Sequence, residues 1–371
     1  MKVRFFAGGL YTTLVARIKP LANFLSSFGV DCDVITPINF GHFAKGKIAN
    51  IFSAILTYSA RKCVEAINAS DVVLIGRSSN LQAYLLMKAL KRRNVRVIFD
   101  LDDALFLPVG SLLGIKIRPG SFYLERMLKE ADYVTVNGHY LLNYVKRYNR
   151  NTSIVNDPVD TNLFNPKFRS RNNDKVTITW EGSANVNFEN LTMLVNPLRM
   201  IAKEYGRKVK FKIASYLGDQ RVKKLFHPLE KYMEVDYGSE RWLPMNRFTR
   251  LIYDSDIMVS PLKENQWFEG KSALRVGIAM AMGAPVVASP VGEQKYIIKH
   301  GVNGFLAKNE DEWYQYLKIL IEDEDLRERM GREGRKTAEK ELSLEVNGKK
   351  LYDIVIKVRS ISFRQALKGE N

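Results

Sequence analysis

Lys271 and Arg275 are two cations whose type and spacing suit the binding of an anion. Ser272 is a typical N-cap residue, so the sequence predicts a helix that begins near Ser272 and ends before Gly283. A helix N-terminus offers free amide groups and partial positive charge to a phosphate, and Arg275 follows Lys271 by one turn. Fixed charge of this kind stabilises a diphosphate leaving group. The alternative is that both residues are solvated surface charges.

The loop before this helix follows a predicted strand at residues 256–260. Ligands of parallel sheets lie beyond the carboxyl ends of the strands, so we expect residues 266–272 to line a ligand crevice. Within this loop, Glu269 is a candidate acceptor for hydrogen bonds from sugar hydroxyls, and Gly270 belongs to the same candidate donor site.

Other candidates for the donor site also follow predicted strands. Gly182 and Ser183 come after residues 176–180, and we expect them to line the donor crevice. Tyr216 comes after residues 210–214, and we expect the turn that begins with it to flank a nucleotide base.

The N-terminal half has candidates of its own. Asp102 and Asp103 follow the predicted strand 96–100, where a carboxylate can orient an acceptor or sugar hydroxyl; alternatively, they cap the next helix or end the strand. Gly8 and Gly9 allow the backbone to approach a bound sugar and diphosphate closely, although a plain tight turn has the same sequence. Two further candidates without an assigned role are Arg17 and Arg77.

One pattern that occurs twice positions these residues: an apolar strand, a glycine-containing loop, an amphipathic helix and a second apolar strand. Such alternation predicts parallel βαβ units. In the first copy, residues 3–7 are the strand and residues 13–27 the helix. Further strands are predicted at residues 31–36, 71–75, 96–100, 132–136, 153–156, 176–180, 210–214, 256–260 and 285–288.

The length of 371 residues indicates about two domains. Residues 157–175 are rich in Pro, Asn and charge, which predicts a linker. We therefore expect an α/β protein with two Rossmann-like domains, residues 1–168 and 169–347, that face each other across a cleft. Residues 348–371 are expected to form a helix that packs back on the first domain.

The formal net charge of +17 indicates an anionic partner: nucleic acid, an anionic membrane surface or a phosphorylated substrate. A merely soluble basic surface is the alternative. Residues 40–67 mix apolar residues with Lys and Arg, which is typical either of a helix in a membrane interface or of an ordinary domain helix.

Targeting and metal signals are absent from the sequence. It shows no signal peptide and no run approaching the ~20 apolar residues that span a bilayer. The cysteines, Cys32 and Cys63, have no metal-type spacing and predict a reducing compartment. We expect a cytoplasmic protein, peripheral on the inner face of a membrane, with no cofactor and no metal.

Several segments together resemble glycosyltransferase family 4, the retaining enzymes of GT-B architecture. Residues 270–292 (GKSALRVGIAMAMGAPVVASPVG) resemble its donor-site helix and following strand, and HGVNGFL at 300–306 resembles a recurrent segment of that family. RERMGREGRKTAEKE at 327–341 resembles its C-terminal helix pair. Three shorter segments, VNDPVDTNLFNP (155–166), FDLDDALF (99–106) and TWEGSA (179–184), are also similar to the family or one of its subgroups.

The chain departs from the pattern of that family and resembles a divergent subgroup that lacks the paired-glutamate motif. The two glutamates would fall on Gly270 and Ile278, with Glu269 one place away from the first. The usual Arg–Lys pair would fall on Ser183 and Phe188. Positive charge for a diphosphate must then come from Lys271 and Arg275. A His-Asp pair of the family corresponds to Asp102 and Asp103.

The resemblance implies a metal-independent, retaining glycosyltransferase that moves a sugar from a nucleotide donor to a hydroxyl acceptor, either a glycan or a lipid-linked precursor. The C-terminal domain would hold the donor and the N-terminal domain the acceptor. One alternative is a metal-dependent GT-A enzyme that uses the triplet Asp100-Leu101-Asp102. Others are a sugar- or nucleotide-binding relic without turnover and a basic nucleic-acid-binding protein, although no nucleic-acid-binding motif is present.

Overall fold

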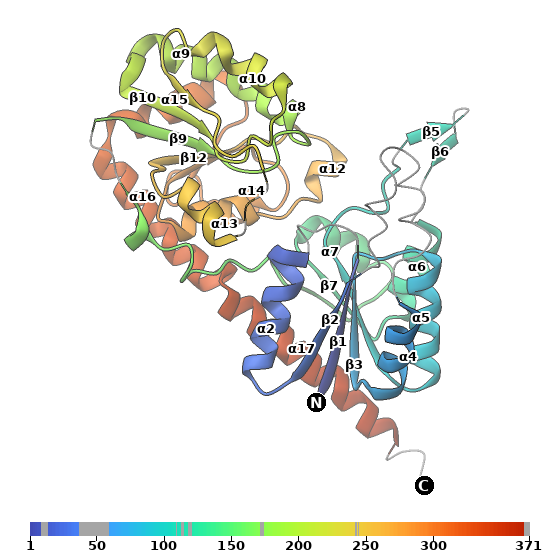
Figure 1. The fold of residues 1–371 in the computed structure, drawn as a ribbon. Helices are drawn as coiled ribbons and strands as arrows, with labels where there is room; N and C mark the ends of the chain where they lie inside the picture. The colour runs from blue at the N-terminus through green and yellow to red at the C-terminus, as the bar shows by residue number, and fades with distance from the viewer. Residues whose placement is uncertain are drawn as a thin grey trace. The chain divides into compact units, whose positions relative to one another are not determined.

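The computed structural model describes residues 1–8, 14–36, 59–108, 110–112, 115–117, 121–170, 174–241, 243 and 245–366. The chain divides into two compact units (Figure 1). Unit 1 comprises Met1–Pro158, Gly270–Ser272 and Leu344–Asn371, and unit 2 comprises Val159–Glu269 and Ala273–Ser343. Gly9 and most of the basic segment at residues 40–67 lie outside the described residues.

Unit 1 is built on a six-stranded parallel sheet in the order β2-β1-β3-β4-β7-β8. A two-stranded antiparallel ribbon, β5–β6, is separate from this sheet. The strands are β1 (Lys2–Ala7), β2 (Asp31–Ile35), β3 (Val72–Gly76), β4 (Arg96–Leu101), β5 (Gly110–Leu112), β6 (Ile115–Ile117), β7 (Tyr133–Val136) and β8 (Thr152–Ile154). The helices are η1 (Leu14–Ile18), α2 (Lys19–Ser27), α4 (Ala60–Ala69), α5 (Leu81–Arg92), α6 (Ser121–Glu130), α7 (His139–Val145) and α17 (Leu344–Ala366).

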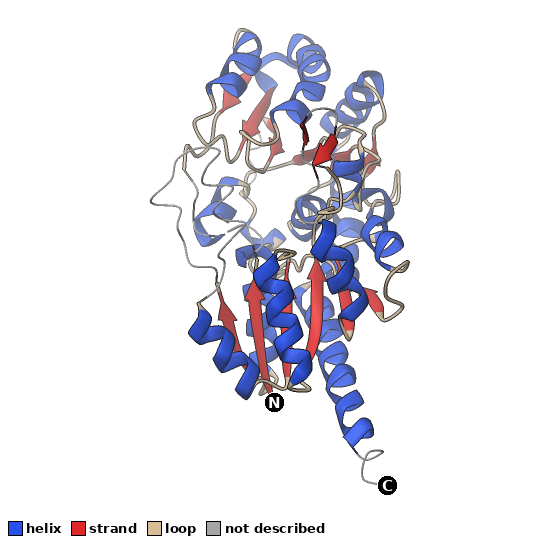
Figure 2. Ribbon diagram, turned by 90° about the vertical axis from the view of Figure 1, so that its right-hand side faces the viewer, coloured by secondary structure: helices blue, strands red, loops and turns tan. Residues whose placement is uncertain are grey.

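Both faces of the unit 1 sheet are covered, which explains why strands such as β3 (VVLIG) are apolar throughout. On one face, Phe6, Ile75 and Phe99 pack with residues of α5 and α6. On the other face, residues of β1, β3 and β4 pack with α2 and α17. Figure 2 shows helices on both sides of these strands. The C-terminal helix α17 therefore completes the core of unit 1, with Leu351 and Val355 buried.

The helix predicted at residues 13–27 is two segments. The chain forms one wide π-helical segment, η1, before the regular helix α2 begins at Lys19. Pro20 stands within the first two positions of α2, where a missing amide hydrogen costs least.

Unit 2 has a second six-stranded parallel sheet, in the order β11-β10-β9-β12-β13-β14. The strands are β9 (Val176–Trp180), β10 (Val209–Ile213), β11 (Glu234–Asp236), β12 (Ile257–Ser260), β13 (Val286–Ala288) and β14 (Phe305–Leu306). Its α-helices are α8 (Phe188–Leu191), α9 (Val195–Tyr205), α10 (Gln220–Phe226), α11 (Met245–Phe248), α12 (Gln266–Glu269), α13 (Leu274–Ala281), α14 (Gln294–Ile297), α15 (Glu310–Glu322) and α16 (Glu324–Thr337).

Short 3-10 and π-helical segments complete unit 2: η2 (Pro166–Phe168), η3 (Thr192–Leu194), η4 (Gly206–Lys208), η5 (His227–Leu229), η6 (Thr249–Leu251) and η7 (Ala338–Leu342). The core of unit 2 also lies on both faces of its sheet. Residues of α9 and α15 pack on one face, and the apolar helix α13 packs on the other. Two parallel sheets with helices on both faces confirm the prediction of two Rossmann-like folds.

Candidate active site

Gly182 follows β9, at the carboxyl edge of the unit 2 sheet, and its backbone makes room for Arg275. Its φ of 136° is one that residues with a side chain rarely adopt. A Cβ atom at this position would lie 2.8 Å from both Nε and Nη2 of Arg275. The structure thus brings together two of the predicted donor-site residues, and it explains the glycine by the close approach of the guanidinium.

Arg275 is held in the first turn of α13, with its side chain only 25% exposed. Its nearest carboxylate is Glu181, with Nε and Oε1 3.9 Å apart, and its Cζ lies 5.5 Å from the centre of the Trp180 ring. The 3.9 Å separation is too long for a hydrogen bond. Among the residues that the structure describes, the Arg275 guanidinium makes no hydrogen bond, which leaves its donors available to an anion.

Burial shifts the pKa values of both Arg275 and Glu181. It lowers the pKa of the Arg275 guanidinium, and the charge of Glu181 opposes that shift. It also raises the pKa of the Glu181 carboxyl, against the charge of Arg275. An anionic ligand would stabilise the charged guanidinium in this partly dehydrated place.

The donor-site helix begins near Ser272 as predicted, but its N-cap is one residue later than expected. α13 spans Leu274–Ala281, and its N-cap is Ala273, with no side-chain capping bond from Ser272. Lys271 precedes the helix, as a cap at Ser272 would also place it, and Arg275 lies in the first turn of the helix. The segment between β12 and α13 also contains the short helix α12 rather than loop alone.

Lys271 belongs to unit 1, with Gly270 and Ser272, and it pairs there with the predicted N-terminal carboxylates. Its Nζ donates a hydrogen bond to Oδ1 of Asp103 at 2.7 Å. Arg77 contacts the other oxygen of Asp103 and lies 3.6 Å from Oδ2 of Asp102. Three of the predicted catalytic residues, Lys271, Asp102 and Asp103, thus share one cluster of alternating charges.

The two aspartates of this cluster are nearly inaccessible to solvent. Burial raises the pKa of Asp102 to about 6, the charges of Asp103 and Asp100 add to the shift, and Arg77 opposes it. Arg77 has a φ of 49°, and its amide donates to the carbonyl of Asp100 at 2.9 Å. A non-glycine residue in this region is strained, so the surrounding structure holds Arg77 in place.

The other predicted donor-site residues Glu269, Gly8 and Ser183 each contact protein groups nearby. Glu269 pairs with Lys295 of α14, with 2.6 Å between Oε2 and Nζ. Gly8 lies against β3: its amide donates to Gly76 at 2.8 Å, and a Cβ would lie 2.4 Å from that carbonyl oxygen. Packing thus explains Gly8 without a ligand. Ser183 is half-buried and accepts bonds from Asn187 through its carbonyl group.

Tyr216 is 2% exposed and packs edge-on against Tyr237, 5.3 Å between ring centres. Its ring is thus covered by protein, and the turn continues through Leu217 and Gly218, whose φ values are 57° and 71°. Ile278, the position to which the resemblance assigns a second glutamate, is buried in α13.

Two residues that matter here had no role predicted from sequence. Glu181 is 8% exposed beside Arg275, and its only signal is its position directly before Gly182. Arg17 was a candidate without a role, and it is 1% exposed. It donates two hydrogen bonds to Asp100, at 2.7 and 2.8 Å, and others to Asp157 and the Val155 carbonyl.

These contacts show Arg17 to be a structural link. They also account for Asp100, the first residue of the Asp100-Leu101-Asp102 triplet, which accepts a further bond from Thr135. In the described part of the chain, no group of three or more His, Cys, Asp or Glu side chains is arranged to hold a metal ion. None of the helices described has the length and apolar character needed to cross a bilayer.

The sheet edge around Gly182 and Arg275 lies in the part of the chain that matches a family model. Residues 175–323 match the model of Glycosyl transferases group 1. A search of curated proteins finds no sequence match.

Solved structures resemble the chain over nearly its whole length. A glycosyltransferase from Rickettsia africae has a TM-score of 0.70 at 14% identity, covering 96% of this chain and 98% of that one. Sucrose-phosphate synthase from Thermosynechococcus elongatus has a TM-score of 0.72 at 13% identity, covering 97% and 100%. HepE from Anabaena, in complex with UDP-glucose, has a TM-score of 0.65 at 15% identity, covering 96% and 100%. The fold is therefore that of the GT-B glycosyltransferases, not the GT-A fold of the alternative.

Proposed function

We propose that this protein transfers a sugar from a nucleotide-diphosphate donor to the hydroxyl group of a glycan or lipid-linked acceptor. The family match over residues 175–323 supports glycosyl transfer. The similar HepE protein is in complex with UDP-glucose, which supports a nucleotide sugar as donor.

The observation that carries this proposal is the guanidinium of Arg275. It is three-quarters buried, packs against Gly182, and makes no hydrogen bond within the part of the chain described. Arg suits the recognition of phosphate because its planar guanidinium donates two parallel hydrogen bonds. A donor diphosphate would supply the missing acceptors and the missing negative charge at the carboxyl edge of the unit 2 sheet.

In the proposed reaction, residues of unit 2 bind the nucleotide and residues of unit 1 orient the acceptor. Asp102 or Asp103 accepts a hydrogen bond from the acceptor hydroxyl. Arg275, with Lys271, stabilises the charge that grows on the diphosphate as the bond to the anomeric carbon breaks. The departing phosphate oxygen takes the proton of the acceptor hydroxyl as the acceptor oxygen bonds to the anomeric carbon, and the configuration at that carbon is retained. Cationic side chains supply this charge, so we propose that no metal is required.

Charge supports the proposed class of acceptor. Most of the excess positive charge of the chain lies in unit 1, to which we assign the acceptor. A positive surface raises the local concentration of anionic molecules, such as lipid-linked precursors or the anionic face of a membrane. We propose a cytoplasmic protein that acts at such a surface.

The donor site is tested by calorimetric titration of the wild type and Arg275→Ala with UDP, GDP and ADP. We expect one nucleotide to bind the wild type and to lose at least 10-fold in affinity in Arg275→Ala. Arg329→Ala, which removes an exposed cation of the same unit, is the matched control and should bind normally. Equal affinity in all three proteins would remove Arg275 from the site.

Turnover is tested separately with the sugar donor of whichever nucleotide binds. Release of nucleoside diphosphate above background supports the enzyme, whereas binding with no release identifies a relic without turnover. The anomeric configuration of the product, read by NMR, tests retention.

A further inference from the structure

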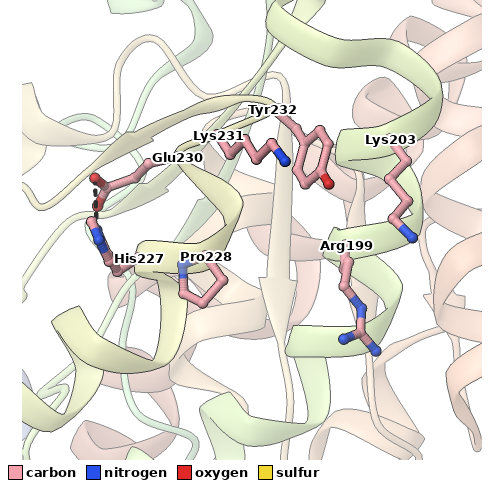
Figure 3. Close-up of a pocket in the computed structure, with 7 residues that line it drawn as sticks. All are labelled: Arg199, Lys203, His227, Pro228, Glu230, Lys231 and Tyr232. Carbon is pink, nitrogen blue, oxygen red and sulfur yellow. Dashed lines mark hydrogen bonds and ion pairs between the residues drawn. The ribbon is translucent and has the colours of Figure 1, made fainter.

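One pocket of unit 2 shares no lining residue with the sheet edge that carries Gly182 and Arg275. It has a volume of about 620 Å³ and lies between the second half of α9, η5 and the three residues that follow η5 (Figure 3). Pockets of roughly 300–1,000 Å³ are the size that binds small molecules. Its lining residues are Arg199, Lys203, His227, Pro228, Glu230, Lys231 and Tyr232.

The lining is strongly cationic. Arg199 and Lys203 lie one turn apart on α9, so both side chains extend from the same face of the helix. Lys231 comes from the segment after η5, and its Nζ lies 5.5 Å from the centre of the Tyr232 ring. Figure 3 shows Tyr232 between Lys231 on one side and Lys203 and Arg199 on the other. All three cations are exposed and therefore accessible to a ligand.

These three cations have no carboxylate partner among the residues that the structure describes. The Arg199 guanidinium donates a hydrogen bond to the uncharged side-chain oxygen of Asn196. Elsewhere in unit 2, Lys175, Lys210 and Lys212 each form an ion pair within 3 Å. Unpaired cations around one concavity repel one another, and an anion between them would remove that repulsion.

Carboxylates are available nearby in the sequence, but each is used elsewhere. Glu204 is next to Lys203 and instead pairs with Lys318 and accepts from Tyr314. Glu230 is next to Lys231, and its two oxygens contact Tyr237 at 2.8 Å and His227 at 3.1 Å. Both carboxylates thus have other partners, and Glu230 is the one carboxylate among the lining residues of the pocket.

We infer that this pocket binds a soluble anion that carries two or more phosphate groups. Three cations on two sides of the opening match the charge of such a ligand better than that of a single carboxylate. Phosphate oxygens accept the hydrogen bonds that Arg and Lys donate. The pocket would bind independently of the proposed sugar transfer, because it shares no residue with the candidate active site.

The test is calorimetric titration with tripolyphosphate in the full-length chain. Every protein carries Arg275→Ala, so that the candidate donor site contributes little. The pocket variant adds Arg199→Ala, Lys203→Ala and Lys231→Ala. The matched control instead adds Lys308→Ala, Arg329→Ala and Lys340→Ala, which remove three exposed cations of unit 2 outside the pocket. Melting temperatures check that each variant is folded.

We expect the pocket variant to bind tripolyphosphate at least 10-fold more weakly than its parent, and the control to stay within about 2-fold. The inference is overturned if the parent shows no binding, or if the control loses as much affinity as the pocket variant. Should the triple variant melt early, Lys203→Glu alone carries the test, because reversing one exposed charge should also lower the affinity at least 10-fold.

Discussion

A Cβ atom at Gly182 would lie 2.8 Å from Nε of Arg275. The glycine at the end of β9 and the arginine of α13 are therefore in direct contact within the candidate donor site. We predict that Gly182→Ala displaces the guanidinium and lowers the affinity for the donor nucleotide by roughly 10- to 100-fold, equivalent to about 1.4–2.8 kcal/mol. Titration calorimetry measures the change.

Gly301→Ala is the matched control for this prediction. Gly301 also has a positive φ, 77°, but nothing lies within 4 Å of its would-be Cβ. Both variants should lose about 1 kcal/mol or more of stability through backbone strain. Only Gly182→Ala should lose affinity. If both variants bind the nucleotide as the wild type does, the packing of Gly182 on Arg275 has no part in binding.

Lys271 pairs with Asp103. We predict that Lys271→Ala slows sugar transfer by about 10²–10³-fold. This is the effect of removing one group that stabilises the growing negative charge of the transition state. The measurement is kcat and KM with the donor identified by titration. Lys295→Ala, which breaks a neighbouring ion pair with Glu269, should have a much smaller effect. Normal turnover in Lys271→Ala would show that its pair with Asp103 is only structural.

We predict that the stability of the protein depends on pH because Asp102 is buried. Its pKa in the folded protein, about 6, is above the ordinary value of 3.8 for an aspartic acid, so the unfolded chain releases this proton first as pH rises. The contribution of Asp102 to the free energy of unfolding should therefore be highest below about pH 4. It should fall by up to roughly 3 kcal/mol as pH rises to about 6.

Urea unfolding of wild type and Asp102→Asn between pH 4.5 and 8 measures this effect. The asparagine variant lacks the ionisation, so its stability relative to the wild type should increase with pH up to about pH 6 and then stay constant. Stability curves that run parallel across the whole range would contradict the assignment.

Arg17 is buried and makes two hydrogen bonds to Asp100. We predict that Arg17→Ala lowers the free energy of unfolding by about 3–5 kcal/mol, because it leaves a buried carboxylate without its partner. Arg4→Ala breaks the more exposed pair with Asp31 and should cost no more than about 1 kcal/mol. Equal losses in urea unfolding would mean that the Arg17 network contributes little.

Local patterns in the sequence were enough to predict the architecture. The apolar runs at β1, β3 and β9 bury both faces, and the helices between them have apolar stripes, so the alternation itself requires parallel sheets. The glycine after β9 and the cation at 275 were likewise predicted as parts of one site. Strand ends and helix starts are properties of nearby residues, which a sequence displays directly.

Only the tertiary structure decided which charges meet. Arg17 pairs with Asp100, and Lys271 with Asp103, across 83 and 168 positions of the chain. Nothing local to either residue encodes its partner. The guanidinium of Arg275 is buried against Gly182 because folding packs α13 beside the end of β9, and that burial is what makes it a candidate for binding a phosphate.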